Sequence, residues 1–290
     1  PGRPLDAAEV PAQEVLSARD GARLACRHFR PAATPWAAVL IAPAMGMEAR
    51  HYEAFAQWLA GQGAAVLCFD YRGMGASRFD RPLRGFKADV DDWLLDQDAA
   101  LNALAQRHPG VPLLLLGHSL GAQLAAALPS VARLDGLLGV SMGSGYIGDQ
   151  RADFRPRSRL FLYAIAPLAL RLCGHFPGQR LGIIGDVPAP AMRQWLRWCR
   201  TPGYLLDAEQ RRPLYRAARF PVISLQMADD EMLADSGFRL MFEAFGNPRR
   251  RQTVHPAAGE RVGHTGIFRA RHRDTQWPLL RDNLKELCSP

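Results

Sequence analysis

The stretch "LLLLGHSLGAQLAAAL", residues 113–128, holds the pattern glycine-x-serine-x-glycine between a run of leucines and a run of small residues. The pattern places Ser119 at its centre. A second copy, at residues 139–143 in "GLLGVSMGSGY", places Ser141 at its centre. Because two copies occur within 290 residues, the pattern alone does not identify a nucleophile. The local structure expected around each serine has to decide between them.

Apolar strands and helices alternate along most of the chain. Apolar runs that hardly alternate with polar residues are typical of strands buried on both faces of a sheet, and they occur at 37–45, 64–73, 112–119, 134–140 and 221–230, with a weaker run at 251–256. Helical patterns lie at 52–63, 89–110, 120–128, 238–246 and 277–287. Strands separated by helices pair in parallel. The sequence therefore predicts a doubly wound α/β fold, with an antiparallel hairpin from residues 14–29 at the sheet edge.

The alternation fails between residues 146 and 213, where helix-like pieces carry many prolines, arginines and aromatic residues. Two regular halves of one sheet flank this segment. We therefore expect an α/β core in two parts, residues 1–145 and 214–290, interrupted by a helical cap or lid insertion at 146–213.

The local context favours Ser119 as a nucleophile. A serine nucleophile on such a sheet sits on a strained turn between a strand and a helix, and small neighbours let the two approach closely. Ser119 follows four leucines and precedes a helical pattern that begins with Gly121 and Ala122. Ser141 follows a strand but precedes "GSGYIGDQ", which has no helical pattern. The alternative interpretations are that Ser119 only N-caps a helix and that Ser141 lies at a glycine-rich loop exit.

A serine hydroxyl needs a base to take its proton, and the base needs an acid to orient it. On this fold the chain order is serine, acid, histidine. Asp229, Asp230 and Glu231 stand at the end of the strand that follows the insertion. Three consecutive acids are unusual for a purely structural turn, so we expect the acid among them.

Three histidines follow those acids, His255, His264 and His272. His264 is preferred because it lies in "RVGHTGIF", where glycines on both sides favour a loop that reaches over the sheet edge. His255 lies in a strand pattern, and His272 lies among charged residues in "RARHRD".

These motifs together resemble the α/β-hydrolase superfamily, and the likeness covers nearly the whole chain outside the insertion. It rests on residues 117–121, on "DYRGMGAS" at 70–77, on the Asp229-Asp230 turn and on Gly263-His264. The chain is similar to uncharacterised bacterial hydrolases and, more loosely, to the monoacylglycerol lipase and serine aminopeptidase branch. In such proteins the "DYRGMGAS" segment is mostly structural, so Asp70 and Arg72 are not catalytic candidates.

The resemblance implies a mostly parallel eight-stranded sheet with helices on both faces and a catalytic triad of Ser119, Asp230 and His264. Family acids often stand in a glycine-x-x-aspartate turn, which corresponds here to residues 227–230 with a methionine in place of the glycine. That register points to Asp230, with Asp229 as the second candidate.

The resemblance also implies an oxyanion hole made by the backbone N–H groups of Met45 and Leu120. Many relatives carry a His-Gly pair after the third strand, whereas this chain has Pro43-Ala44 there. A backbone donor does not need that pair, but the geometry of this loop is left open.

The function expected from these residues is hydrolysis of a carboxylic ester of small to medium apolar acyl length through an acyl-enzyme. A peptidase or thioesterase with the same triad is the alternative among enzymes. A non-catalytic binding protein on the same scaffold is the alternative from another class. No metal or organic cofactor is implied, and the oligomeric state is open.

The insertion contains two apolar segments, "RLFLYAIAPLALRL" and "MRQWLRWC". Apolar surface of this extent must be covered. It could pack onto the core, lie on a membrane surface, or line an acyl pocket; its position at the carboxyl edge of the sheet favours the pocket. Phe161 and Trp195 are the substrate-contact candidates.

Composition sets the remaining expectations. The net charge of +8 comes from scattered arginines, with two lysines only, so nucleic-acid binding is not expected. The five cysteines show no C-x-x-C spacing, which argues against a disulfide framework or zinc site. The longest apolar run, 160–170, is too short for a membrane span, and Pro167 within it is expected to interrupt the helix. The N-terminal stretch lacks an apolar signal pattern, so a cytoplasmic protein is the default expectation.

Overall fold

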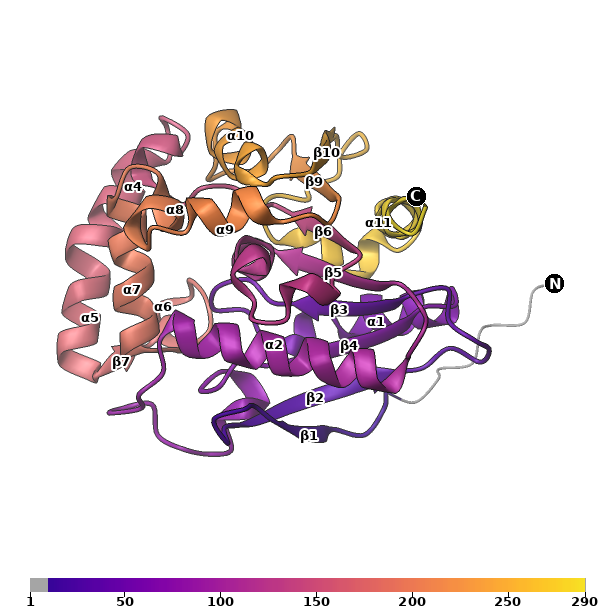
Figure 1. Ribbon diagram of the computed structural model, residues 1–290. Coiled ribbons are helices and arrows are strands. Elements are labelled where there is room, and N and C mark those ends of the chain that lie inside the picture. The colour runs from indigo at the N-terminus through magenta and orange to yellow at the C-terminus, as the bar shows by residue number, and fades with distance from the viewer. Residues whose placement is uncertain (1–9, 290) are drawn as a thin grey trace.

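The computed structural model describes residues 10–289, and its centre is an eight-stranded sheet (Figure 1). Residues 1–9, most of the stretch expected to lack a signal, lie outside the described part. The strand order is β1-β2-β4-β3-β5-β6-β9-β10. The β1–β2 and β2–β4 pairs are antiparallel and the others are parallel. The strands are β1 Glu14–Ser17, β2 Arg23–Phe29, β3 Ala38–Ala42, β4 Ala65–Phe69, β5 Leu113–His118, β6 Gly136–Val140, β9 Val222–Met227 and β10 Pro248–Val254.

Each face of the sheet carries its own hydrophobic core. In β3, Leu40 packs in the core under one set of helices, and its neighbour Ile41 packs in the core on the opposite face. This alternation explains why the strands read as unbroken apolar runs, because side chains on both faces are buried. The helices of the first face are α2 Val90–Arg107, α3 Leu120–Gln123, α9 Arg212–Ala217 and α10 Asp235–Ala244; those of the second are α1 Glu53–Gly61 and α11 Trp277–Leu287.

The predicted fold class is confirmed, with differences in individual helices. The helix expected over 120–128 is α3 followed by a 3₁₀ turn, η3, because the last alanines close i→i+3 hydrogen bonds. The helix expected over 238–246 begins earlier, at Asp235, and ends at Ala244. The 3₁₀ helices are η1 Ala49–His51, η2 Gly75–Arg78, η3 Ala125–Ala127, η4 Val131–Arg133, η5 Ile147–Asp149, η7 Gly266–Phe268 and η8 Ala270–His272.

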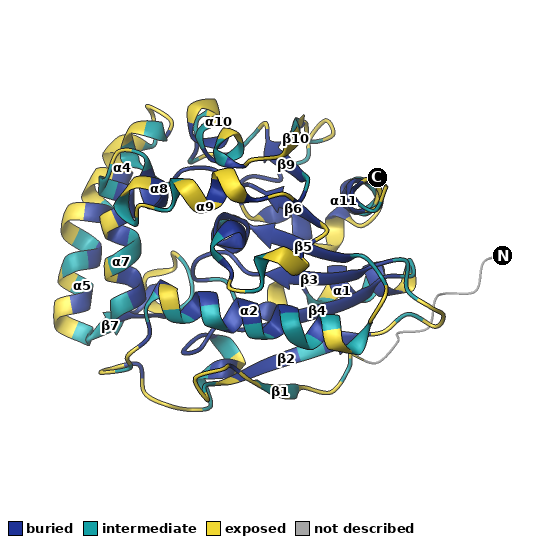
Figure 2. Cartoon of the chain, viewed as in Figure 1, coloured by how far each residue is buried: buried dark blue, intermediate teal, exposed yellow. Residues whose placement is uncertain are grey.

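The segment between β6 and β9 forms helices that gather at one end of the sheet, on the left in Figure 1. Figure 2 shows that their outward turns are exposed, whereas the central strands β3, β4, β5, β6 and β9 are buried. The segment also holds a short hairpin, β7–β8, that the sequence patterns missed because each strand has two residues. Its elements are α4 Arg155–Leu160, the π-helix η6 Phe161–Ile165, α5 Ala166–Cys173, β7 His175–Phe176, α6 Gly178–Leu181, β8 Val187–Pro188, α7 Ala189–Arg200 and α8 Tyr204–Ala208.

Pro167, which the sequence suggested would interrupt this segment, does not break the helix. The π-helical turn of residues 161–165 runs directly into α5, and Pro167 occupies the first turn of α5. A proline inside a helix removes one main-chain hydrogen bond and crowds the preceding turn, and here that preceding turn is the π-helical one, where the regular α-helical hydrogen bonding is already interrupted. The helix α4, the π-helical turn and α5 therefore form one continuous helix with a π-type turn in its middle.

The turn between β5 and α3 depends on two glycines that admit no side chain. A methyl carbon on Gly117 would lie 2.3 Å from the Ala122 Cα, and one on Gly121 would lie 2.2 Å from the Ala42 carbonyl oxygen. Both distances are far inside van der Waals contact. The close approach of β3, β5 and α3 is thus built into the sequence around Ser119.

Replacing Gly121 with alanine should lower the free energy of unfolding by about 1–3 kcal/mol, since backbone must move to admit the methyl group. Gly61→Ala in α1 is the matched control. Nothing lies within 4 Å of the added methyl group there, and alanine is the better helix former by up to about 1 kcal/mol. Urea denaturation compares the two variants. Equal stability of the two would contradict the close approach at the turn.

Candidate active site

Ser119 lies on the strained turn that the sequence predicted. Its backbone has φ 47° and ψ −110°, outside the usual regions for a residue with a side chain. Hydrogen bonds hold it there. The Ser119 N–H donates to the Val140 carbonyl at 2.8 Å, and the Ser119 carbonyl accepts from the N–H groups of Ala122 and Gln123. The strain is retained because β6 and α3 fix the backbone on both sides.

His264 and Asp230 lie beside Ser119, although both are far from it in the sequence. The Ser119 hydroxyl is 3.2 Å from His264 Nε2, and His264 Nδ1 is 2.6 Å from Asp230 Oδ2. His264 and Asp230 are both buried. The structure thus brings together the three residues that the sequence selected, and their atoms form one hydrogen-bonded line.

The three consecutive acids all contact the loop that carries His264, each through different atoms. Asp229 accepts from the backbone N–H groups of Val262 and Gly263, at 2.8 and 3.0 Å. Glu231 accepts from the His264 N–H at 3.2 Å. Asp230 alone reaches the imidazole. The geometry therefore agrees with the register that points to Asp230. Asp229 and Glu231 instead hold the loop of His264 in place through its backbone amides.

Asp230 is itself fixed by its own turn. Its Oδ1 accepts from the backbone N–H groups of Met232 and Leu233, at 2.9 and 3.0 Å. These bonds leave the other carboxylate oxygen for His264. The carboxylate is therefore oriented before any substrate arrives.

The protonation equilibria of the pair are shifted in opposite directions. Burial alone would raise the pKa of Asp230, but the adjacent His264 and the hydrogen bonds to it outweigh burial and lower that pKa. Burial alone would lower the pKa of His264, but the charge of Asp230, its hydrogen bond and Glu231 raise it overall. Asp230 is thus an anion at neutral pH that stabilises an imidazolium on His264.

The two backbone amides expected to form an oxyanion hole are free to donate. Within residues 10–289, neither the Met45 N–H nor the Leu120 N–H donates a hydrogen bond to another protein group. Leu120 is the first residue of α3, so the positive end of that helix faces the turn. The loop has Pro43-Ala44 in place of His-Gly. A residue outside the loop holds it, because the Ala44 N–H donates to the Tyr52 hydroxyl at 3.1 Å.

Ser141 has a different role in this geometry. Its backbone also has a positive φ, 51°, at the end of β6. Its side chain, however, is fully buried, and its hydroxyl donates to the His264 carbonyl at 3.1 Å. The second glycine-x-serine-x-glycine copy thus supports the loop of His264 and presents no hydroxyl to the pocket.

A pocket of about 560 Å³ opens above Ser119, between the core and the segment after β6. Phe161 and Trp195, the predicted substrate-contact residues, both line it. Their rings pack edge to face, with centroids 6.4 Å apart. Met45 and His264 line it from the core. Most of the remaining lining is apolar, and it includes Leu160, Leu162, Ile165, Ile183, Ile184, Met232 and Leu233.

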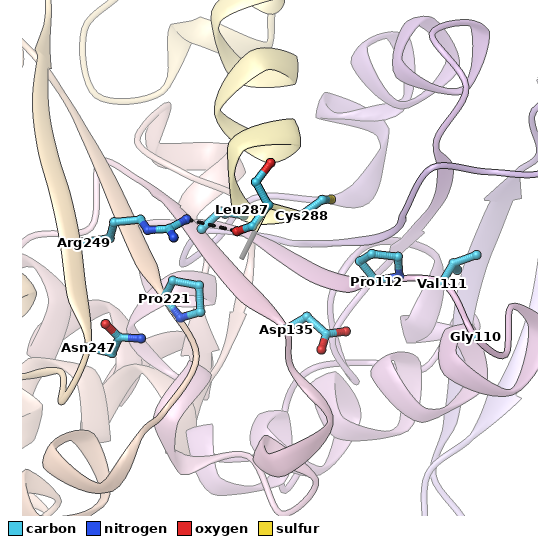
Figure 3. Close-up of a pocket in the computed structure, with 10 residues that line it drawn as sticks. Gly110, Val111, Pro112, Asp135, Pro221, Asn247, Arg249, Leu287 and Cys288 are labelled. Carbon is cyan, nitrogen blue, oxygen red and sulfur yellow. Dashed lines mark hydrogen bonds between the residues drawn. The ribbon is translucent and has the colours of Figure 1, made fainter.

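A larger hollow, about 690 Å³, lies at the opposite end of the sheet (Figure 3). Arg249, Asp135 and Cys288 line it at the amino ends of the strands. Burial raises the pKa of the Cys288 thiol to about 11, which keeps it protonated and unreactive. In doubly wound sheets, ligands bind at the carboxyl ends of the strands. The pocket above Ser119 is therefore the candidate site, despite its smaller volume.

The sequence reasoning missed several groups around the site. Tyr52 and His118 are fully buried behind Ser119, and Gln123 and Gln150 line the pocket. His118 carried a signal through its place inside the motif, whereas Tyr52 lies in an ordinary amphipathic helix pattern and carried none.

The described residues, 10–289, contain no cluster of three or more His, Cys, Asp or Glu side chains arranged to hold a metal ion. Over the same range, no helix has both the length and the apolar character needed to cross a bilayer.

Comparisons with known proteins agree with this architecture. Residues 33–147 match the family model described as serine aminopeptidase, S33. Human monoglyceride lipase is 30% identical over 118 residues, which is 40% of this chain and 38% of that protein. The monoglyceride lipase homolog of monkeypox virus is 30% identical over 34% of this chain and 35% of its own length. The matched region therefore spans well under half of these relatives.

Solved structures extend the likeness over the whole fold. A soluble variant of monoglyceride lipase from Saccharomyces cerevisiae aligns with a TM-score of 0.70 at 16% identity, over 100% of this chain and 99% of that one. A carboxyl esterase from Bacillus coagulans aligns with a TM-score of 0.67 at 13% identity, over 97% and 100%. By its sheet order, its strained serine turn and these likenesses, the chain has the α/β-hydrolase fold.

Proposed function

We propose that the protein is a serine hydrolase that cleaves carboxylic esters through an acyl-enzyme. The observation that carries the proposal is the hydrogen-bonded line from Ser119 through His264 to Asp230, at the floor of an apolar pocket. The likeness to monoglyceride lipases and a carboxyl esterase supports an ester as the substrate.

In the first half of the reaction, His264 Nε2 takes the proton of the Ser119 hydroxyl as the oxygen attacks the ester carbonyl carbon. Asp230 accepts the Nδ1–H and so fixes the tautomer that leaves Nε2 free to act as a base. The carbonyl oxygen becomes an oxyanion, and the amides of Met45 and Leu120 donate to it. His264 then gives the proton to the leaving alkoxide as the C–O bond breaks.

In the second half, a water molecule replaces the alcohol. His264 takes a proton from the water, which attacks the acyl carbon and forms a second tetrahedral intermediate. The intermediate collapses, the bond to Ser119 breaks, and the proton returns to the serine oxygen. The products are a carboxylic acid, the alcohol from the first half and the unaltered enzyme.

We further propose that residues 146–213 act as a cap that selects the acyl chain. Phe161, on the π-helical turn, and Trp195, on α7, face each other in the pocket lining. An apolar acyl chain that fills this space is removed from water. Each methylene so buried is worth about 0.8 kcal/mol, or roughly a fourfold change in rate ratio.

Ser119→Ala should abolish labelling by a fluorophosphonate, because the reagent reacts with an activated serine. Ser141→Ala should keep the label, since the Ser141 hydroxyl is buried against the His264 carbonyl. Gel fluorescence after labelling measures both variants. Labelling that survives in Ser119→Ala would count directly against the proposed nucleophile.

Asp230→Asn should lower kcat by roughly 10⁴-fold, as expected when the acid of a triad loses its charge and the imidazole its tautomer. Asp229→Asn is the matched control one residue away. It keeps one oxygen for the loop amides, so we expect a loss of less than about tenfold. Steady-state kinetics on one p-nitrophenyl ester compares them. A greater loss in Asp229→Asn would move the catalytic acid by one position.

The acid limb of the kcat/KM profile should have its midpoint above the ordinary histidine value. Only neutral His264 acts as a base, so a raised pKa moves the loss of activity to higher pH. Glu231→Gln removes a nearby negative charge while keeping an acceptor for the His264 N–H, and it should shift the limb to lower pH. Glu243→Gln, exposed on α10, is the control. If the pH profile of Glu231→Gln coincides with that of the unaltered protein, Glu231 does not influence the pKa of His264.

On p-nitrophenyl esters, kcat/KM should rise with acyl length until the pocket is full and then fall. Phe161→Ala and Trp195→Ala should each move the optimum toward longer chains, because they enlarge the pocket. Leu168→Ala, 58% exposed on α5, is the control and should leave the optimum in place. A flat profile that neither pocket variant alters would assign the segment to stability instead of acyl selection.

A further inference from the structure

Behind Ser119, a chain of buried hydrogen bonds joins the three loops of the candidate site. The Ala44 N–H contacts the Tyr52 hydroxyl at 3.1 Å, and that hydroxyl is 2.8 Å from His118 Nδ1. His118 Nε2 is 3.0 Å from the backbone carbonyl of His264. Tyr52 and His118 are both fully buried. The chain thus begins next to Met45, passes under Ser119, and ends on His264.

The direction of each hydrogen bond in the chain follows from its ends. The His264 carbonyl can only accept, so His118 Nε2 must carry the proton and His118 Nδ1 must be unprotonated. Tyr52 therefore donates its hydroxyl proton to Nδ1. Its oxygen is left to accept from the Ala44 N–H, which can only donate. The Met47 sulfur, 3.7 Å from the same hydroxyl, is a weaker acceptor than the imidazole nitrogen.

The protons of this hydrogen-bond chain have only this one arrangement. Burial, together with the adjacent His264, lowers the pKa of His118 to about 3, so its ring stays neutral while the ring of His264 gains and loses a proton. Burial raises the pKa of the Tyr52 hydroxyl, which keeps it a donor. The rings of Tyr52 and His118 both pack on Phe268, which prevents rotation out of the chain.

The two ends of the chain are the parts of the site with least support of their own. The loop of residues 43–47 belongs to no helix or strand, and it carries the Met45 amide. His264 also lies outside regular structure. Its carbonyl accepts from both His118 and Ser141. Ser119, in contrast, is fixed by the ends of β5 and α3.

We propose that Tyr52 and His118 are positioning residues that hold the oxyanion loop and the His264 loop in register with Ser119. This inference rests on the proposed function, because it concerns how the oxyanion loop and the His264 loop are placed for the transition state of that reaction. Neither residue touches the substrate. Their effect is transmitted through the Ala44 amide at one end and the His264 carbonyl at the other.

Tyr52→Phe removes one hydroxyl and leaves both neighbours without a partner. We expect kcat to fall by about 10- to 50-fold, because a small misplacement of catalytic groups costs up to about a hundredfold, while KM changes by less than about twofold. A trifluoromethyl ketone, which Ser119 would convert to a tetrahedral oxyanion, should bind more weakly by a factor similar to the loss in kcat. Tyr71→Phe is the matched control. It also removes a buried hydroxyl with one bonded partner, Gln97.

Two substitutions at His118 separate positioning from general packing. His118→Gln places an amide N–H near the site of Nε2 and can still donate to the His264 carbonyl. His118→Asn places its amide near Nδ1 and cannot reach that carbonyl. We expect the glutamine variant to keep at least fivefold more kcat than the asparagine variant. Thermal unfolding of every variant shows whether a loss of activity follows a loss of folded protein.

Equal kcat and inhibitor affinity in Tyr52→Phe and Tyr71→Phe would overturn this role, and so would equal activity of the two His118 variants. The fluorophosphonate test on unaltered protein keeps the two claims apart. If the unaltered protein takes the label and hydrolyses esters while the Tyr52 and His118 variants match it, the positioning role fails and the proposed function stands. If the unaltered protein does neither, both fail.

Discussion

The candidate site depends on one backbone constraint, the turn that holds Ser119 at φ 47° between β5 and α3. A side chain at that φ is unfavourable, and the turn persists because its surroundings leave no alternative. Gly117 and Gly121 admit the helix to within contact of two strands, and the N–H of Ser119 is bonded to β6. The strained turn exposes one hydroxyl, that of Ser119, at the edge of a sheet that is otherwise buried.

Around this fixed point, the structure must place groups carried by irregular backbone. Asp229 and Glu231 clasp the loop of His264 through three backbone amides, and Ser141 holds the His264 carbonyl. Such restraint is what preorganised chemistry requires, because groups that are already aligned need no reorganisation in the transition state. Asp229, Glu231 and the second serine motif all contact this same loop.

Much of the fold was predictable because its signals are local. Leu40 and Ile41, buried on opposite faces of the sheet, produce the unbroken apolar pattern of a parallel strand. The place of Ser119 between a leucine run and Gly121 identified the turn. The choice of Asp230 over Asp229 came from a family register and stays a prediction, although it agrees with the contact to His264.

Other features could not be predicted because they depend on long-range contacts. Nothing near Tyr52 in the sequence indicates that its hydroxyl meets His118, 66 residues away. The path of residues 146–213 was equally hidden. Pro167 suggested a break, yet it falls in the first turn of α5, after a π-helical turn that no periodicity announces. Side-chain contacts across the pocket, such as Phe161 on Trp195, follow only once that path is known.

The central claim is that a single serine, Ser119, becomes covalently attached to the acyl group. The most direct measurement uses a long-chain p-nitrophenyl carbamate, which leaves a slowly hydrolysing carbamoyl group on a nucleophilic serine. Trypsin then releases residues 108–133, which contain Ser119 and Ser130, separately from residues 134–151, which contain Ser141 and Ser144. Tandem mass spectrometry should find the added mass in the first peptide, on Ser119. Added mass on the second peptide, or inactivation with the first peptide unmodified, would contradict the account.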